Sequence, residues 1–476
     1  MKRRAVVLSG LVSILGGCTV GPNYQPPAIP VPPRWNETPS EATPESESSL
    51  ASWWSEFRDP TLESLVSRAI ANNLDLEIAS ARIREARSAR GIAASAGRPQ
   101  VGAAAGYSRT SRSDALPPFD AAQGEALPYG PRAQNAFLAG FDASWELDLF
   151  GGVKRDVEAA SAQIQATEES RRDVLVTLVA DVARVYVELR GAQKRLQILD
   201  DVLSSQRETL SLVASRFEAG LFTALDVSLA EGLLATTTSN RPLLERSARQ
   251  SMYRLGVLLG RDPASLIAEL EPLGSTPFAP PEIPATLPSD LLSRRPDLRR
   301  AERELAAATA RIGVARADLF PRFSIAGSFG RLSDDPAELG HGSSQFWGVV
   351  PGVRWPILSG GRIRANVGAN EARQQQALLR YRNAVLTALE EVENALVACS
   401  RERRRETSLR DAILANRQAL ELAKQRYTGG VESFLVVLEA ERGVYATEDD
   451  WVASQTNVVV AFVSLYKSLG GGWGSS

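Results

Sequence analysis

The 476-residue chain is poor in the side chains that most often carry chemistry or bind metal ions: it has one histidine, two cysteines and two methionines. The only histidine, His341, lies in a Gly/Ser-containing stretch, which argues against a histidine-based catalytic triad or a histidine metal cluster. Two methionines give little support for a relay of soft metal ions. The glycine run 470–472 lacks a following Lys-Ser/Thr and is not a phosphate-binding loop. We therefore expect a protein that is not an enzyme and holds no metal or cofactor.

An excess of positive charge is also missing. The chain has 54 Lys and Arg against 56 Asp and Glu, a formal net charge of −2, and offers no basic field for nucleic acid. Its carboxylates mostly fall among Lys and Arg, for which a solvated helix surface is the default interpretation. The apolar content of 44% is ordinary for a globular protein.

A long apolar run is absent as well. Residues 5–16 form a twelve-residue apolar stretch after Lys2, Arg3 and Arg4, which suits a signal peptide but not a bilayer span of about 20 residues. The sequence Leu-Gly-Gly-Cys at 15–18 then predicts a lipobox, with residues 1–17 removed and acyl chains on Cys18. Thr19 follows Cys18 where Asp would indicate inner-membrane retention, so outer-membrane sorting is favoured. The alternative is an ordinary cleaved signal followed by an incidental cysteine.

The remaining cysteine, Cys399, has no partner for an intramolecular disulfide once Cys18 carries lipid, and we interpret it as a buried apolar side chain. Residues 18–60 contain many prolines and are predicted to form an extended, lipid-anchored segment. Residues 271–289 form a second Pro-rich stretch, interpreted as a linker.

What the chain does contain is a duplication. Residues 76–109 align without a gap with residues 298–331 at an offset of 222, and later positions repeat at an offset of 209 or 210. The matched residues include Gly91 with Gly313, Trp145 with Trp355, Gly151-Gly152 with Gly360-Gly361, Arg216-Phe217 with Arg426-Tyr427, and Ala230-Glu231 with Ala440-Glu441. A unit of about 200 residues is far longer than solenoid or propeller repeats. We define a first repeat at 61–270, a second at 290–472 and a tail at 473–476.

Each repeat is predicted to contain long coiled-coil helices. From 178 to 217, eleven of twelve positions with 4,3 spacing are apolar, and Gln206 is the exception. Without a Gly-Pro break between 152 and 216, one helix of about 65 residues would be about 95 Å long. Two shorter helices, over 62–97 and 226–260, would stack to match it. In the second repeat the charge run 401–406 interrupts the seam and is interpreted as a solvated face.

Both long helices are predicted to end in tight turns. Ala219-Gly220 and Gly429-Gly430 are helix-stop signals, and Thr223 and Ser433 are N-cap candidates at matched positions of the two repeats. Thr223 with Asp226 also resembles a capping box. Each repeat therefore makes a helical hairpin with a short tip.

Two strand pairs are predicted, 101–109 with 137–148 and 323–331 with 346–357. Apolar residues alternate with small or acidic ones along residues 137–148, and residues 347–357 are patterned similarly. A soluble sandwich would alternate in the same way. However, four strands cannot close a membrane barrel, whose smallest form has about eight. Closure must come from several chains.

Several motifs resemble the TolC-type outer-membrane factors, in particular their lipidated NodT-like branch. They are Gly21-Pro22-Asn23-Tyr24, Trp53-Trp54 with Phe57-Arg58-Asp59-Pro60, Leu287-Pro288-Ser289-Asp290-Leu291-Leu292, Arg294-Arg295-Pro296-Asp297-Leu298, the stretch 308–321, and the closing residues 467–473. The resemblance implies an α+β membrane channel: a homotrimer with a 12-stranded β-barrel in the outer-membrane lipid and a 12-helix periplasmic α-barrel. It also implies a periplasmic adaptor (membrane fusion protein) and an inner-membrane RND-type pump as partners. The loops 111–135 and 332–345 would lie outside the cell.

The resemblance also suggests site residues. Gly220, Leu221, Gly430 and Val431 are adaptor-docking candidates at the tips, unless the glycines are merely helix stops. Related channels close with apolar and acidic side chains in the segment matching 435–442, so Leu435, Glu439 and Arg442 are gate candidates. The family often has Asp where this chain has Glu439. The alternative is that Glu439 and Glu441 lie on a solvated face.

The predicted function is a passive exit duct for small molecules or drugs in a tripartite efflux pump. A type I protein-secretion component would share the fold. A structural envelope lipoprotein would also use long helices but would have no need of the paired strands, and an envelope hydrolase lacks its catalytic constellation.

Overall fold

The computed structural model describes residues 19–37, 43–44, 50–111, 133–274, 284–285 and 288–474. Cys18 and the predicted signal peptide lie outside this set. By its internal contacts the chain divides into two compact units, one from 1–26, 84–165 and 303–379 and the other from 27–83, 166–302 and 380–476. Each unit draws on both sequence repeats.

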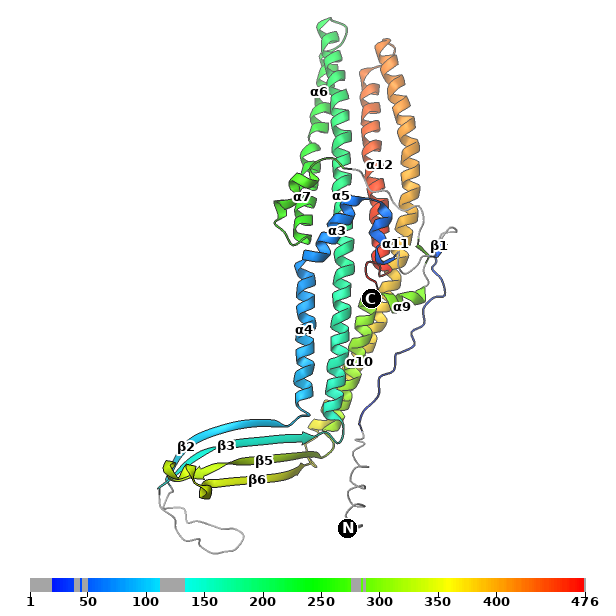
Figure 1. Ribbon diagram of the computed structural model, residues 1–476. Helices are drawn as coiled ribbons and strands as arrows, with labels where there is room; N and C mark the ends of the chain where they lie inside the picture. The colour runs from blue at the N-terminus through cyan, green and yellow to red at the C-terminus, as the bar shows by residue number, and fades with distance from the viewer. Residues whose placement is uncertain are drawn as a thin grey trace. The chain divides into compact units, whose positions relative to one another are not determined.

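The first unit contains a four-stranded antiparallel sheet in the order β2-β3-β5-β6 (Figure 1). Its strands are β2 (Gln100–Ser111), β3 (Ala133–Leu147), β5 (Arg322–Ser333) and β6 (Gln345–Arg354). Strands β3 and β5 join the two hairpins, with Phe141 opposite Phe329. The two predicted strand pairs are thus confirmed and are joined in a single sheet.

The last strand is shorter than predicted. It ends at Arg354, whose partner Arg322 is the first residue of β5. Pro356 has no N–H to donate to a ladder, and the Trp355 indole instead donates to the carbonyl of Leu319 over 3.1 Å. The prediction that the strand continues to 357 was therefore wrong.

The junctions between helix and strand repeat in the two halves. The Trp145 indole donates to the carbonyl of Gly97 over 3.0 Å, as Trp355 does to Leu319. Gly97 and Leu319 are aligned positions of the two repeats, at the offset of 222. Each tryptophan thus ties a strand to the end of the preceding helix.

Four helices contribute residues to both units: α4 (Leu74–Ser95), α5 (Gly152–Glu218), α10 (Pro296–Ala317) and α11 (Arg362–Thr428). Helices α5 and α11 have 67 residues each without interruption, which confirms the predicted long helices. Gln206, the polar exception in the predicted seam, is buried with its apolar neighbours.

The second unit contains the two helical hairpins (Figure 1). Helix α5 turns into α6 (Ala224–Thr238), followed by α7 (Arg241–Leu258), and α11 turns into the single helix α12 (Phe434–Ser468). The hairpins pack together near their tips through eight buried residues, Val213, Ala230, Leu233, Ala423, Tyr427, Phe434, Val437 and Leu438. The capping box of Thr223 and Asp226 is confirmed, whereas Ser433 occupies the N-cap position of α12 without a side-chain cap bond.

Short elements complete the second unit. They are β1 (Thr43–Pro44) paired in parallel with β4 (Pro284–Ala285), η1 (Trp53–Phe57), α3 (Pro60–Asn72), η2 (Pro263–Leu266), α8 (Ile267–Leu270), η3 (Pro288–Asp290) and α9 (Leu291–Arg294). Trp53 of η1 is fully buried and stacks on Tyr466 at 5.2 Å between ring centroids. The segment 18–60, predicted to be extended throughout, therefore ends in a helical turn that anchors it in a core. Two further turns, η4 (Pro336–Gly340) and η5 (Gly342–Ser344), connect β5 to β6 in the first unit.

Among the helices that the structure describes, none combines the length and the apolar character that a bilayer crossing requires.

Candidate functional site

The sheet presents one apolar face and one face of small and polar residues. The strand registers place Phe141, Phe329 and Trp347 in one row across three strands. This row belongs to the apolar face, which comprises Val101, Ala103, Tyr107, Phe137, Phe141, Trp145, Phe323, Ile325, Phe329, Trp347, Val349 and Val353. The opposite face carries mainly small and polar residues, Gly102, Gly106, Gly140, Asp142, Ser144, Glu146, Ser324, Ser328, Gly330, Gly348 and Gly352, together with four large apolar residues, Leu138, Leu332, Phe346 and Val350.

The apolar face is largely uncovered in the single chain. Trp347 is 74% exposed, and Phe141, Phe329 and Val349 are also exposed. Soluble monomers rarely expose large contiguous apolar patches, and such a patch marks a membrane or protein contact. An apolar outer face with small and polar residues behind it is the pattern of a strand between lipid and an aqueous lumen.

The hairpin tips expose the predicted docking residues. Leu221 is 71% and Val431 is 69% exposed. Gly220 and Gly430 have φ of +73° and +72°, and a Cβ on either would meet no atom within 4 Å. Because left-handed φ favours glycine, both act as helix stops. The open space leaves room for a second chain at each tip.

The three gate candidates lie together at the start of α12. Arg442 Nη1 lies 3.3 Å from Glu439 Oε1 in an i,i+3 ion pair, and Leu435 lies one turn before Glu439. All three side chains are exposed, so in the single chain this face of α12 is open to solvent.

Glu441 differs from its neighbours and was not recognised in the sequence. Its side chain is only 5% exposed, so the idea that it shares a solvated face with Glu439 was wrong. Glu441 Oε1 accepts a hydrogen bond from Thr209 of α5 at 3.0 Å and lies 3.1 Å from Lys424 Nζ of α11. This carboxylate therefore links three helices just behind the gate candidates.

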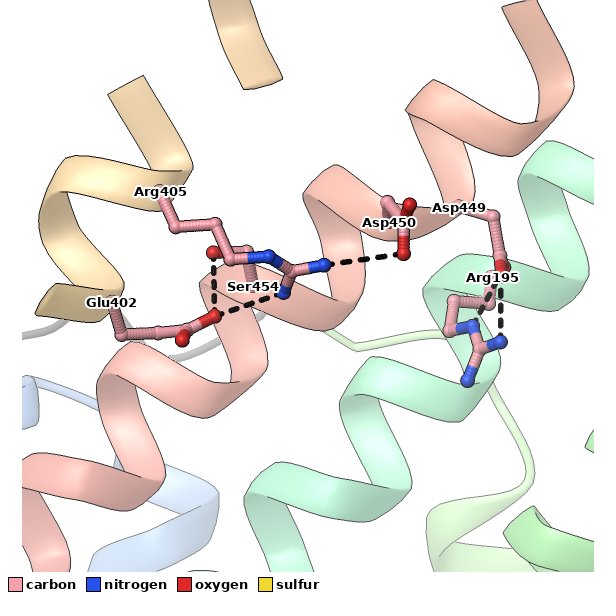
Figure 2. Close-up of polar contacts among 6 residues, drawn as sticks. All are labelled: Arg195, Glu402, Arg405, Asp449, Asp450 and Ser454. Carbon is pink, nitrogen blue, oxygen red and sulfur yellow. Dashed lines mark hydrogen bonds and ion pairs between the residues drawn. The ribbon is translucent and has the colours of Figure 1, made fainter. Parts of the chain in front are cut away.

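C-terminal to the gate candidates, α12 contacts α5 and α11 through polar side chains (Figure 2). Arg195 of α5 donates two hydrogen bonds to Asp449, at 2.6 and 2.7 Å. The hydrogen bonds from Arg195 to Asp449 hold the pKa of the guanidinium above its usual range. On the adjacent side of α12, Arg405 of α11 contacts Asp450 at 3.3 Å. Paired hydrogen bonds of this kind fix orientation as well as distance.

The charge run 401–406 takes part in this interface. Glu402 accepts hydrogen bonds from Arg405 and from buried Ser454 of α12, and Arg403 lies 4.7 Å from the ring centroid of Phe462. The interpretation of this run as a solvated face was wrong, because four of its six residues, Glu402, Arg403, Arg405 and Glu406, contact α12. Polar residues replace the apolar seam here and make the contact specific.

The remaining sequence candidates show no arrangement for catalysis. His341 is exposed and lies 3.3 Å from Glu338. Cys399 is buried as predicted, and burial raises the pKa of its thiol to about 12. Over the described residues, no group of three or more His, Cys, Asp or Glu side chains could hold a metal ion.

A sheet with an apolar outer face, joined through repeated helix–strand junctions to long helical hairpins, defines a protomer of a membrane channel. The chain belongs to the outer membrane efflux protein family, whose model matches residues 65–261 and 287–471. This is a family of outer-membrane efflux proteins rather than of enzymes.

Individual relatives match over almost their full length. Outer membrane protein OprJ of Pseudomonas aeruginosa is 35% identical over 99% of this chain and 97% of its own. Nodulation protein T of Rhizobium leguminosarum bv. trifolii is 33% identical over 96% of this chain and 94% of its own. The solved structure of the outer-membrane channel OprN superposes with a TM-score of 0.86 at 35% identity, over 96% of this chain and all of that one. The TolC-type resemblance and the tandem-repeat α+β channel fold are thereby confirmed.

Proposed function

We propose that three copies of this chain form the outer-membrane exit duct of a tripartite efflux pump. The observation that carries the proposal is the sheet: its apolar face is exposed, and its edge strands β2 and β6 each pair on one side only within the described chain. Hydrocarbon cannot satisfy open strand edges. Three sheets of four strands close a ring of twelve, which removes every edge.

The helices extend this duct into the periplasm as a 12-helix barrel that receives small molecules or drugs from an RND-type pump through a periplasmic adaptor. The exposed tips at Leu221 and Val431 support docking to an adaptor's helical hairpin. Replacing Gly430 with Trp should abolish crosslinking to the adaptor while the trimer persists. Retained crosslinking would mean that the tip glycines act only as helix stops and do not bind the adaptor.

Assembly is tested by native mass measurement of the detergent-extracted protein. We expect a trimer, and a stable membrane-inserted monomer would contradict the closed ring. Single-channel recording of the same sample should show a conducting pore, which a purely structural envelope lipoprotein would lack.

The anchor of this duct is an acyl group on Cys18, proposed from the lipobox at 15–18. Cys18→Ala should abolish incorporation of labelled palmitate, and unchanged labelling would refute the site. Partial channel activity should survive, because the sheet itself enters the membrane.

The gate of this duct is formed by Leu435 as an apolar constriction and by a ring of three Glu439 carboxylates, each held by Arg442. A ring of carboxylates attracts cations. Glu439→Ala should raise the basal conductance or weaken the preference for cations, with Glu231→Ala as the control from the first repeat. Wild-type values for both quantities in an intact trimer would place the gate elsewhere.

A further inference from the structure

The residues immediately after Cys18 lie in a slot within the first unit. Val20 donates its N–H to the carbonyl of Phe150 over 3.1 Å. Arg155, in the first turn of α5, donates from Nε to the carbonyl of Val20 at 3.1 Å and from Nη2 to the carbonyl of Gly21 at 3.2 Å. The same Nη2 donates to Asn23 Oδ1 at 2.7 Å. Arg155 is only 3% exposed, so a buried guanidinium is used mainly to hold this segment.

Glycines set the width of the slot. Gly21 has φ +93°, and a Cβ there would lie 2.4 Å from the Cα of Gly313 in α10. A Cβ on Gly313 would lie 2.7 Å from Arg155 Cγ, and one on Gly151 would lie 2.9 Å from the Cα of Thr19. At Gly21 and Gly151 the close contact is with backbone atoms and is open only to glycine, whereas at Gly313 a Cβ would displace the Arg155 side chain. The slot therefore accepts the segment only while glycines occupy these positions.

An aromatic side chain closes the far end. Tyr24 packs against a cluster of small buried residues, Ala162, Ala306 and Ala307. The Arg303 guanidinium lies 5.6 Å from the centroid of the Tyr24 ring, a distance at which cation–π attraction contributes. The segment is thus bound along its length through main-chain, amide and aromatic contacts.

Helix α4 of the first repeat, which aligns with α10, lacks the close contacts made at Gly313. Gly91 of α4 aligns with Gly313, yet a Cβ on Gly91 would meet nothing within 4 Å. Counted from the matched pairs Gly151-Gly152 and Gly360-Gly361, the residue of α11 that aligns with Arg155 is Arg364, which is exposed, whereas Arg155 is buried. The slot therefore draws Arg155 and Gly151 from the first repeat and Gly313 from the second, and their aligned residues Arg364 and Gly91 are exposed or face open space.

We propose that this slot is a binding site for the chain's own residues 19–24, with Arg155 as its positioning residue, and that it fixes the level of the residue-18 anchor relative to the sheet. Two residues span at most about 7 Å, so the proposed anchor would begin within that reach of Val20 and its bond to Phe150. Phe150 follows shortly after the end of β3 and stacks on Phe320 at 4.6 Å. Girdles of aromatic residues flank the apolar band of membrane barrels at both interfaces, which suits an acyl anchor at this level.

Docking is measured by hydrogen exchange and mass spectrometry on the purified full-length protein. The Val20 amide should exchange at least tenfold faster in Arg155→Ala and in Gly313→Ala than in wild type. Gly91→Ala is the matched control, because it makes the same change at the aligned helix position and should leave Val20 unaffected. Amides of β3 should keep their protection in all variants. Equal Val20 exchange in wild type and Arg155→Ala would overturn the site.

Binding of residues 19–24 in the slot can be tested independently of the proposed lipid anchor. Only the positioning role of the slot rests on that anchor. In Cys18→Ser the Val20 amide should remain protected, because all the contacts come from residues 19–24. Loss of protection in Cys18→Ser would show that the acyl chain and not the slot holds the segment, and would refute the proposal. Palmitate labelling of the wild type reports on acylation independently.

The positioning role is tested by lengthening the chain between Cys18 and the slot. Gly-Ser inserted between Cys18 and Thr19 should lower the yield of outer-membrane trimer severalfold, whereas the same insertion after Ser40 should not. Equal yields from the two insertions would remove the positioning role while leaving the docking result to stand on its own measurement.

Discussion

The two repeats agree in their element boundaries and differ in what their helices contact. Helices α5 and α11 begin and end at positions that differ by 210, one of the repeat offsets. Strands β2 and β5 begin and end at positions that differ by 222, the other offset. Helices α7 and α12 also end at matched positions, Leu258 and Ser468. The duplication therefore preserved the frame of the fold, and the differences between aligned residues indicate where the two halves acquired separate roles.

The clearest difference is the return helix of each hairpin. In the first repeat it is broken between α6 and α7, where Asn240 precedes Pro242 in the first turn of α7. In the second repeat α12 runs through without a break, and the positions aligned with the break, Asp449 and Asp450, bind Arg195 and Arg405 instead (Figure 2). A break permits bending, whereas an unbroken helix with fixed side contacts moves as one body.

Introducing the first repeat's proline into the second should have the largest effect. Val452 aligns with Pro242 and is buried in α12. Val452→Pro removes an intrahelical hydrogen bond and introduces a clash, which costs about 3 kcal/mol or more. We expect a lower melting temperature of the trimer by circular dichroism. Pro242→Ala, at a position where proline costs little, should change it by less than a quarter as much. Comparable effects of the two variants would mean that the break is not what distinguishes the repeats.

The next effect concerns the aligned glutamates. Glu231 is exposed, whereas Glu441 is buried between α5 and α11. Glu441→Ala leaves Lys424 and Thr209 without this partner and should destabilise the hairpin by about 1–3 kcal/mol. Hydrogen exchange of α11 near Lys424 should accelerate accordingly. Glu231→Ala should stay within about 0.5 kcal/mol, and a similar loss in both variants would contradict the separate role of Glu441.

A smaller difference is expected at the helix caps. The Thr223 side chain bonds reciprocally with Asp226, whereas Ser433 makes no side-chain cap bond. Thr223→Ala should cost about 1 kcal/mol, seen as faster exchange of the first-turn amides of α6. Ser433→Ala should have less than half that effect on α12. The opposite ranking would show that Ser433 forms a cap in the assembled trimer.

The smallest effect is a dependence of stability on pH. Glu169 is buried between Arg172 and Arg299, and burial raises the pKa of its carboxyl above the ordinary 4.5 despite both arginines. The folded state therefore holds the proton more tightly than the unfolded state. The free energy of unfolding contributed by this group is highest below pH 4.5 and falls as pH rises through the raised folded pKa.

Glu169→Gln should flatten this decline in melting temperature with pH. Leu379, the aligned residue of the second repeat, is exposed and uncharged, so Leu379→Gln should leave the profile unchanged. A profile of Glu169→Gln identical to that of wild type would mean that the carboxyl titrates normally.

The sequence predicts the long helices, the strands and the tips well because its signals for them are local, but the shorter helices predicted over 62–97 and 226–260 were wrong as single helices, since each is broken in the structure, at Asn73 and at 239–240. Heptad spacing, strand alternation and paired glycines define the long helices, four strands and two tips to within a few residues. The burial of Glu441 was missed because it depends on α5, α11 and α12 meeting at one point, which no local pattern describes. The slot around Arg155 was missed for the same reason, although Gly21 and Gly313 both lie in motifs that carried the family resemblance.

The order of the strands restricts how copies of this chain can join. Edge strand β2 comes from the first repeat and edge strand β6 from the second, and they run in opposite directions because all three pairings between them are antiparallel. In the proposed ring every copy has the same orientation in the membrane, so β6 of one copy would meet β2 of the next antiparallel, as inside the sheet. Pairing two identical edges antiparallel would require one copy to be inverted in the bilayer. The contact is therefore heterologous, with two different surfaces, and each half of the ancient duplication supplies one of them.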